Sequence, residues 1–334
     1  MRTTLLSLLS FLSTLGLGLA WLGLLGPGMG DPRAQHIEAA LGHEGASLLI
    51  LGNSVTQSAI DPAVIAEGLG LAEGAVASLA SEGAGPGAWL ATLERAQAAG
   101  WAPRVLLLYV PFDMVWTPLP ATDEDVALLV ELNASDAAFA LAGRPSPGAA
   151  VRWIQRREAV QRYLLGMLSA GLVDALWQAP VGARRASERA RQAVFAEGGP
   201  NDPAGRGARL DGGPARDSAS QADPGVARAL IATARRHGMR LVVAQPAQHP
   251  EVAARPCGQV VENPELEKLL IEGGADVLDL ATALPGSQRF KTRHHLLPVG
   301  KAELSVILAD GLAEMQVLTA PPTQPGRRWT APCP

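Results

Sequence analysis

Short apolar runs that alternate with helical segments are the feature that most limits how this chain can fold. Each run is bounded by turn-forming residues. None has the regular alternation of apolar and polar residues that is typical of a strand with one face in solvent. Strands of this kind are buried on both faces, which is typical of a parallel sheet covered by helices. The five runs, of which the second is weak, cover 47–53, 75–80, 104–111, 239–246 and 275–281.

The segments between these runs have helical spacing and helix-boundary residues. The first starts with a capping Asp61 and with Pro62 at the first helical position. We expect helices over 61–68, 86–99, 226–237 and 298–317. This order predicts an α/β fold with a flavodoxin-like, doubly wound parallel sheet, whose ligand sites lie at the carboxyl ends of the strands.

The middle of the chain interrupts this alternation. Residues 123–195 have a helical pattern, and 196–225 are rich in Gly, Pro and Asp. We therefore divide the chain into an α/β domain (47–122 and 226–318), an insertion (123–225) and a C-terminal tail (319–334). The insertion is either a lid or membrane-facing cap, or a plain helical decoration. Four arginines of the insertion form either a site for an anionic glycan or lipid head group or a solvated helix face. They are Arg152, Arg156, Arg157 and Arg162.

The first thirty residues form a separate apolar segment. No charge occurs between Arg2 and Asp31, and a helix over 5–25 would be roughly 31 Å long, close to the thickness of a bilayer core. We expect a single-pass inner-membrane anchor that places the rest of the chain in the periplasm, followed by a linker over 31–46. The alternatives are a cleaved signal peptide, which would make the protein secreted, and a buried core helix.

The two cysteines fit an oxidising compartment. Cys257 and Cys333 are candidates for a disulfide, which would close a long loop worth on the order of 4 kcal/mol in the chain-entropy model. The alternative is two unrelated thiols.

Composition and motifs exclude several classes of partner and cofactor. The net charge of −4 gives no electrostatic basis for nucleic-acid binding. The chain has no phosphate-binding P-loop and no metal motif, so we expect no cofactor and no metal. Gly83, Gly85 and Ala88 fit a loose dinucleotide fingerprint, but Pro86 lies inside it and no acidic residue lies between Glu94 and Asp113, where the ribose contact belongs.

The stretch "LGNSVTQSAIDP", residues 51–62, carries the most informative hydroxyl. Ser54 follows the first strand, where a strand-to-helix turn could hold a nucleophile, although a small turn residue is the alternative. A serine nucleophile needs a base from elsewhere in the chain. His294 and His295 lie in a loop after the fifth strand, at the same predicted edge of the sheet, and either could be a loop histidine without a catalytic role.

The other histidines have simpler interpretations. His36 and His43 lie in the predicted linker, and His237 precedes Gly238 as a helix-capping residue. His249 lies in a loop after the fourth strand.

Four short blocks together resemble the SGNH/GDSL hydrolase superfamily, in particular its membrane-anchored, envelope-facing branch. The blocks are "LGNSVTQSAIDP", "SEGAGPG", "LYVPFD" and "HHLLPVGKAEL", in the family's order over about 47–315. The resemblance implies Ser54 as nucleophile and His295 as base, with backbone N–H donors to the oxyanion from Ser54 and from Gly83 or Gly85.

The sequence departs from the family in each polar role around this pair. Asn53 stands where the family has Asp, and Phe112 stands where it has an oxyanion-binding Asn. The family's Asp three residues before the histidine is replaced by Thr292. Asp113 and Thr292 are therefore the candidates for orienting the His295 ring.

The resemblance implies an extracytoplasmic acyltransferase or esterase that acts on an envelope polysaccharide or other glycan. The family's alginate and D-alanyl transfer factors work beside membrane-bound O-acyltransferases, so such a protein is the implied partner, with a glycan or acyl carrier as substrate. The alternative is a catalytically degenerate relative that binds a glycan or an assembly partner in the cell envelope.

Overall fold

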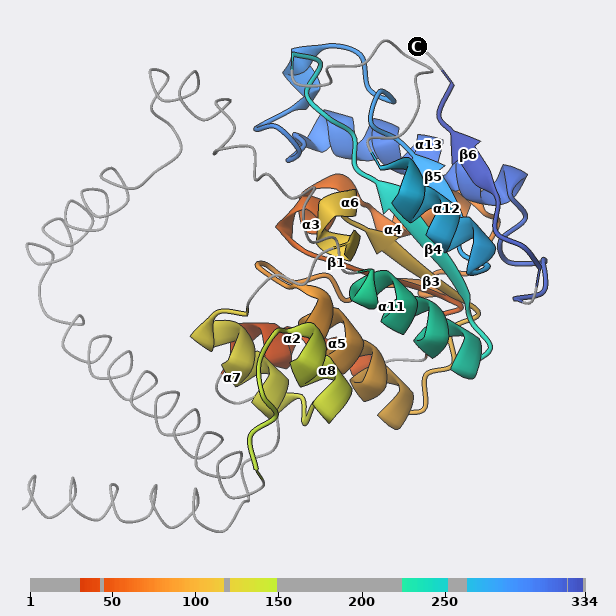
Figure 1. Ribbon diagram of the computed structural model, residues 1–334. Helices are drawn as coiled ribbons and strands as arrows, with labels where there is room; N and C mark the ends of the chain where they lie inside the picture. The colour runs from red at the N-terminus through yellow and green to blue at the C-terminus, as the bar shows by residue number, and fades with distance from the viewer. Residues whose placement is uncertain are drawn as a thin grey trace, which may run out of the picture.

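The computed structural model describes residues 31–42, 45–116, 121–148, 224–251, 263–322 and 324–332 (Figure 1). Several predictions lie outside the described residues: the anchor, both cysteines, His43, the four arginines of 152–162 and most of the insertion. Within the described part, no helix combines the length and the apolar character needed to cross a bilayer.

Six parallel strands form one sheet, which confirms the predicted α/β class. Their order across the sheet is β2-β1-β3-β4-β5-β6. Four of the strands are buried along their whole length, as the uniformly apolar runs predict. The strands are β1 (Leu48–Gly52), β2 (Val76–Ser78), β3 (Val105–Tyr109), β4 (Arg240–Gln245), β5 (Asp276–Asp279) and β6 (Arg328–Thr330).

Helices connect these strands and cover both faces of the sheet. Three of the predicted helices coincide with α4, α5 and α11 to within a residue or two, and the fourth coincides with α13 except for its last turn. The helices are α2 (Pro32–Leu41), α3 (Ser54–Ala59), α4 (Pro62–Gly68), α5 (Pro86–Ala98), α6 (Phe112–Trp116), α7 (Asp123–Glu131), α8 (Asp136–Leu141), α11 (Gly225–Arg236), α12 (Pro264–Glu272) and α13 (Pro298–Glu314).

Alternate residues of β1 to β5 enter two separate cores. In β1, Leu49 and Leu51 belong to the core that includes residues of α2, α5, α7, α8, α11 and α12, whereas Leu48 and Ile50 belong to the core that includes residues of α3, α4 and α13. Figure 1 shows the first group of helices on one side of the sheet, with α4 and α13 on the other. This two-sided burial fixes the register of the strands, because a shift by one residue would exchange the two cores.

The structure differs from the expected organisation at three places. The segment expected as a linker forms α2, whose Ala34, Ile37 and Leu41 are buried in the first core. The start of the expected insertion forms α7 and α8, which pack against α5. The expected tail contains β6, which adds to the sheet beside β5. In α2, α7 and α8 apolar residues at helical spacing are buried, whereas β6 joins the sheet through its pairing with β5 and has no fully buried residue.

A buried ion pair joins β4 to β5 at the end where β6 begins. The Arg240 guanidinium pairs with both oxygens of Asp276, with Nη2 donating to Oδ1 at 2.8 Å, and both side chains are almost fully buried. Asp276 also accepts the backbone N–H of Arg327 at 2.9 Å, and Arg240 donates to the carbonyl of Pro321 at 3.1 Å. The pair therefore holds the chain that leads into the last strand.

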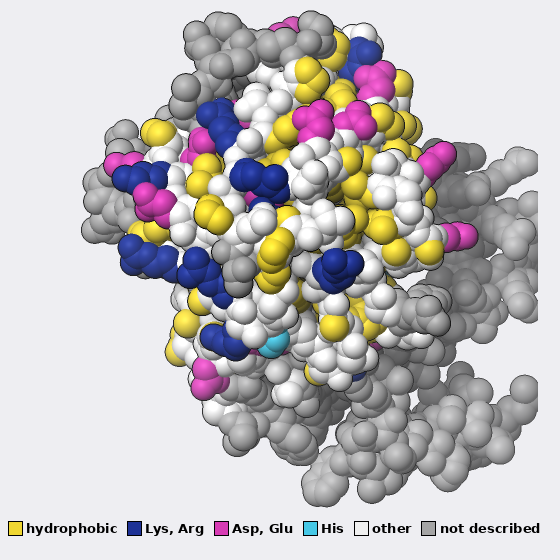
Figure 2. Space-filling view, turned by 90° about the vertical axis from the view of Figure 1, so that its right-hand side faces the viewer, with side chains coloured by type: hydrophobic (Ala, Val, Ile, Leu, Met, Phe, Trp, Pro, Cys, Tyr) yellow, Lys and Arg dark blue, Asp and Glu magenta, His cyan; other side chains and the backbone are white. Residues whose placement is uncertain are grey.

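The outer surface has no dominant charge on the face drawn in Figure 2. Acidic and basic side chains lie there among hydrophobic ones. Among the described residues, the large hydrophobic side chains that are exposed are Leu297, Val299 and Val306, at and within α13.

We expect Arg240→Met to destabilise the fold by about 3–5 kcal/mol, because it leaves the Asp276 charge buried without its partner. The double variant Arg240→Met/Asp276→Leu should recover roughly half of that loss, since no unpaired charge remains. Urea unfolding of each variant measures the effect. Lys268→Met, which breaks an exposed pair with Glu272, is the control and should change little. Equal losses in the single and double variants would contradict this account.

Candidate active site

Ser54 is placed by a tight turn between β1 and α3. A Cβ at Gly52 would lie 1.8 Å from Thr56 Oγ1, so only glycine fits at the end of the strand. Thr56 Oγ1 donates to the carbonyl of Tyr109 at 2.6 Å and accepts the N–H of Asn53 at 3.1 Å. The turn is thus tied to the end of β3, and Ser54 becomes the first residue of a short helix rather than part of an open turn.

Asn53 satisfies the first amides of α3 but not that of Ser54. Its side-chain oxygen accepts the N–H of Val55 at 2.9 Å and also that of Thr56. The N–H of Gln57 donates to the carbonyl of Asn53 at 3.1 Å. Within the described part of the chain, the Ser54 N–H finds no acceptor, so it is available to a ligand.

The structure brings His295 into contact with Ser54, as the sequence predicts. Nε2 of His295 lies 3.1 Å from Oγ of Ser54, although the two residues are 241 positions apart. The backbone N–H groups of Lys291 and Thr292 donate to the carbonyl of His295 at 2.8 and 3.3 Å, which closes the histidine loop on itself. The 3.1 Å between His295 Nε2 and Ser54 Oγ is within the hydrogen-bonding range of a nucleophile and its base.

Contacts between α3, α4 and α13 hold the two halves of the pair together. The backbone N–H of Asp61 donates to Ser305 Oγ at 2.8 Å, and Lys301 Nζ donates to the carbonyl of Gln57 at 3.3 Å. Since α13 starts directly after the histidine loop, these bonds fix that loop against the helix that carries Ser54.

Thr292 makes a hydrogen bond with the second nitrogen of the His295 ring. Its Oγ1 lies 2.8 Å from Nδ1 of His295 and also accepts the backbone N–H of His295 at 3.3 Å. With the proton on Nδ1 donated to Thr292, Nε2 carries the lone pair that faces the Ser54 hydroxyl. Of the two candidates for orienting the ring, Thr292 holds this position.

Asp113 lies elsewhere. One of its carboxylate oxygens accepts the N–H of Met114 at 3.0 Å, and its charge acts on His294 rather than on His295. Burial, together with the charge of Arg293, lowers the pKa of His294 to about 4, so this ring is neutral at pH 7. Asp113 therefore acts electrostatically on His294, the residue before His295, and not on the His295 ring.

The local environment also keeps His295 neutral. Burial lowers its pKa below the ordinary value of 6.5, and the charge of Lys291 lowers it further, while Glu82 acts in the opposite direction. A neutral ring at neutral pH is the form that can take a proton from a serine hydroxyl.

The glycine-rich loop after β2 runs beside the end of β1. The N–H of Ser81 donates to the carbonyl of Gly52 at 3.3 Å, and the Gln57 side chain donates to the carbonyl of Ala80 at 3.0 Å. Gly83 has a φ of +70°, in the left-handed region, and Gly85 caps the start of α5. Neither glycine N–H donates a hydrogen bond within the described residues.

Among the described residues, His295 is the histidine that hydrogen-bonds to Ser54; the others lie elsewhere. His237 ends α11 before Gly238, which confirms its predicted capping position, and His36 lies in α2. His249 supports the histidine loop from outside: its N–H donates to the carbonyl of Arg293 at 2.9 Å, and its ring packs edge-on against Phe290. Sequence reasoning missed this support and that of Thr56, because both depend on contacts between distant segments.

Comparison with known proteins adds no relative: no family model matches this chain, and no curated protein does so either.

We expect two substitutions to move the pKa of His295 in opposite directions. Lys291→Gln should raise it, because a nearby positive charge that disfavours imidazolium is lost. Glu82→Gln should lower it, because a favourable negative charge is lost. NMR titration of the His Cε1–H signals measures both shifts. Shifts of the same sign would contradict this electrostatic account.

Proposed function

We propose that this protein is an SGNH-like serine acyltransferase or esterase that works outside the cytoplasm on an envelope polysaccharide or other glycan. The observation that carries the proposal is the chain of contacts from Ser54 Oγ to His295 Nε2 at 3.1 Å and from His295 Nδ1 to Thr292 Oγ1 at 2.8 Å. A hydroxyl, an imidazole and a ring-orienting group in this order are the working parts of a serine nucleophile.

The position of these residues in the fold supports the same proposal. The first five strands follow the order 2-1-3-4-5 of a flavodoxin-like, doubly wound sheet. Ser54 follows β1, the glycine loop follows β2 and His295 follows β5, so all three leave the sheet at its carboxyl edge. The SGNH resemblance assigns its nucleophile, oxyanion and histidine blocks to these three segments.

The proposed reaction uses one proton carrier. His295 Nε2 takes the Ser54 proton as Oγ forms a bond to the acyl carbonyl carbon, and the carbonyl oxygen becomes an oxyanion. N–H groups of Ser54, Gly83 and Gly85 are the proposed donors to that oxygen. Collapse breaks the bond to the donor's alcohol, which receives the proton from His295 and leaves an acyl ester on Ser54.

The second half reverses these steps with a new hydroxyl. His295 takes a proton from a glycan hydroxyl or from water, whose oxygen attacks the acyl ester. The Ser54–acyl bond then breaks, and Ser54 recovers its proton from His295. Transfer and hydrolysis differ only in which hydroxyl reaches the site.

The neutral side chain of Thr292 limits the rate of the proposed reaction. It can orient the ring through Nδ1, but it has no negative charge to stabilise imidazolium as a carboxylate does. We therefore assign the site a modest intrinsic rate, suited to an activated acyl donor.

The proposed anchor over 5–25 would hold the site near the membrane. A membrane-bound O-acyltransferase is the proposed partner, since it would deliver acyl groups at that surface. The opposing function is a non-catalytic envelope protein that binds a glycan, for which the missing carboxylate beside His295 is the argument.

Fluorophosphonate labelling of the full chain in detergent tests the nucleophile. We expect wild type and Ser58→Ala to label, Ser54→Ala to remain unlabelled, and His295→Gln to label at least about 10³-fold more slowly. Ser58 is the matched control because it lies on the same helix with its hydroxyl bonded to the Val55 carbonyl. Labelling should fall as the pH drops through the lowered pKa of His295, since only the neutral ring is a base. An unlabelled wild type would favour the binding protein.

Substitution of Thr292 tests how the ring is oriented. We expect Thr292→Val to slow p-nitrophenyl acetate hydrolysis about tenfold, whereas Thr292→Ser retains the rate. Thr292→Asp should accelerate it at least about tenfold and raise the pKa of His295, because a carboxylate stabilises the imidazolium form. Identical rates and pH profiles in all three variants would show that Thr292 does not act on the ring.

A further inference from the structure

We infer that Arg33 is a positioning residue that fixes the direction of the Gly83 N–H, one of the proposed oxyanion donors. The inference rests on the proposed function and extends it to a helix outside the four SGNH-like blocks.

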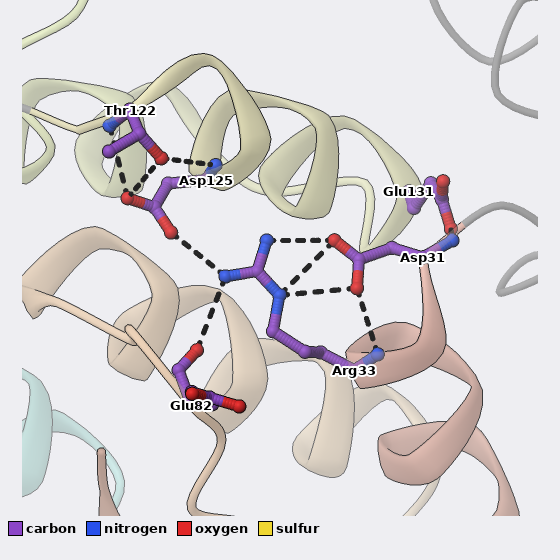
Figure 3. A network of polar contacts seen from close by, with 6 residues as sticks. All are labelled: Asp31, Arg33, Glu82, Thr122, Asp125 and Glu131. Atoms are coloured by element: carbon purple, nitrogen blue, oxygen red, sulfur yellow. Dashed lines mark hydrogen bonds and ion pairs between the residues drawn. The ribbon is translucent and has the colours of Figure 1, made fainter. Parts of the chain in front are cut away.

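Arg33 lies at the centre of a polar network that reaches the glycine loop (Figure 3). Its Nε and Nη2 donate to the Asp31 carboxylate at 3.1 and 2.8 Å, and its Nη1 donates to Asp125 at 2.9 Å. The same Nη1 donates to the backbone carbonyl of Glu82 at 3.4 Å. One guanidinium therefore connects the start of α2, the start of α7 and the loop after β2.

The two carboxylates that hold Arg33 are themselves fixed. The backbone N–H of Asp31 donates to Glu131 Oε2 at 3.0 Å, so α2 starts against the end of α7. Asp125 accepts the N–H and hydroxyl of Thr122 in the capping box of α7. The Arg33 side chain is only 17% exposed, which limits the directions open to its guanidinium.

The geometry of a peptide unit transmits this placement to Gly83. The carbonyl of Glu82 and the N–H of Gly83 belong to the same planar unit, and no described peptide bond is cis. In a trans peptide these two groups point in opposite directions. Because Arg33 holds the carbonyl on its own side, the N–H is directed away from Arg33 and remains without an acceptor in the described part of the chain.

The conformation of Gly83 makes the Arg33 contact important for the orientation of the Glu82–Gly83 peptide. Its φ of +70° is open to glycine, which has few steric limits on rotation of the adjoining peptide. The Ala84 N–H donates to the Ser81 carbonyl at 3.1 Å, which closes a turn around the Glu82–Gly83 peptide but bonds neither the carbonyl nor the N–H of that peptide. Among the described residues, the Arg33 contact is the one hydrogen bond made by that peptide unit.

A second ion pair on α2 provides a matched control. Arg95 of α5 donates to both oxygens of Glu38 at 2.5 and 2.6 Å, and it also joins α2 to the body of the domain. In the part of the chain that the structure describes, Arg95 hydrogen-bonds to Glu38 and not to the Glu82 carbonyl. Arg33→Met and Arg95→Met therefore both loosen α2, but only the first frees the carbonyl of Glu82.

The test compares these variants in the full chain in detergent. We expect Arg33→Met to lower kcat for p-nitrophenyl acetate and the rate of fluorophosphonate labelling about tenfold with KM unchanged, because an oxyanion donor acts mainly in the transition state. Arg95→Met should retain both rates. The N–H residual dipolar coupling of Gly83, measured with 15N-glycine labelling, should change in Arg33→Met and stay unchanged in Arg95→Met.

The outcomes separate this inference from the proposed function. If wild type reacts and the two variants have equal rates, the inference fails and the serine mechanism stands. If wild type does not react, the proposed function fails, and the Gly83 coupling alone decides whether Arg33 orients this peptide. An unchanged coupling in Arg33→Met overturns the inference in either case.

Discussion

The pairing of β1 between β2 and β3, with both its faces buried, is the constraint on which the rest of the structure depends. All strands run in one direction, so every segment that leaves the sheet at the carboxyl end of a strand emerges at the same edge. The bond from Thr56 to the Tyr109 carbonyl then ties the first exit to the end of the neighbouring strand. The geometry of Ser54 is therefore set by backbone and threonine contacts beneath it rather than by the histidine.

In the candidate site, one residue orients the His295 ring and other residues supply the charges around it. Thr292 provides the hydrogen bond that aligns the imidazole, whereas Lys291 and Glu82 provide charges of opposite sign around it. In a site with a buried carboxylate one residue would do both. Here burial favours the neutral ring, and any stabilisation of imidazolium must come from groups that remain in contact with solvent.

The repeating apolar runs predicted much of the fold, and their order placed Ser54 and His295 at one edge. That contact could be predicted because parallel strands have a simple rule for where their ends lie. The parts that could not be predicted are those whose burial depends on partners distant in the sequence. The polar composition of α2 hides three core residues, and β6 has only three residues beside a buried ion pair. The choice of Thr292 over Asp113 depends on the fold of one loop, which spacing alone leaves open.

The 241 positions between Ser54 and His295 have a consequence for the newly made chain. A polypeptide that has emerged only as far as β4 already contains the serine, the glycine loop and four of the six strands, but not His295. The contact between the Ser54 hydroxyl and the imidazole can form only after the loop that follows β5 has been synthesised and folded. Premature termination anywhere before the histidine loop would thus yield fragments that lack the Ser54–His295 pair on which the proposed function depends.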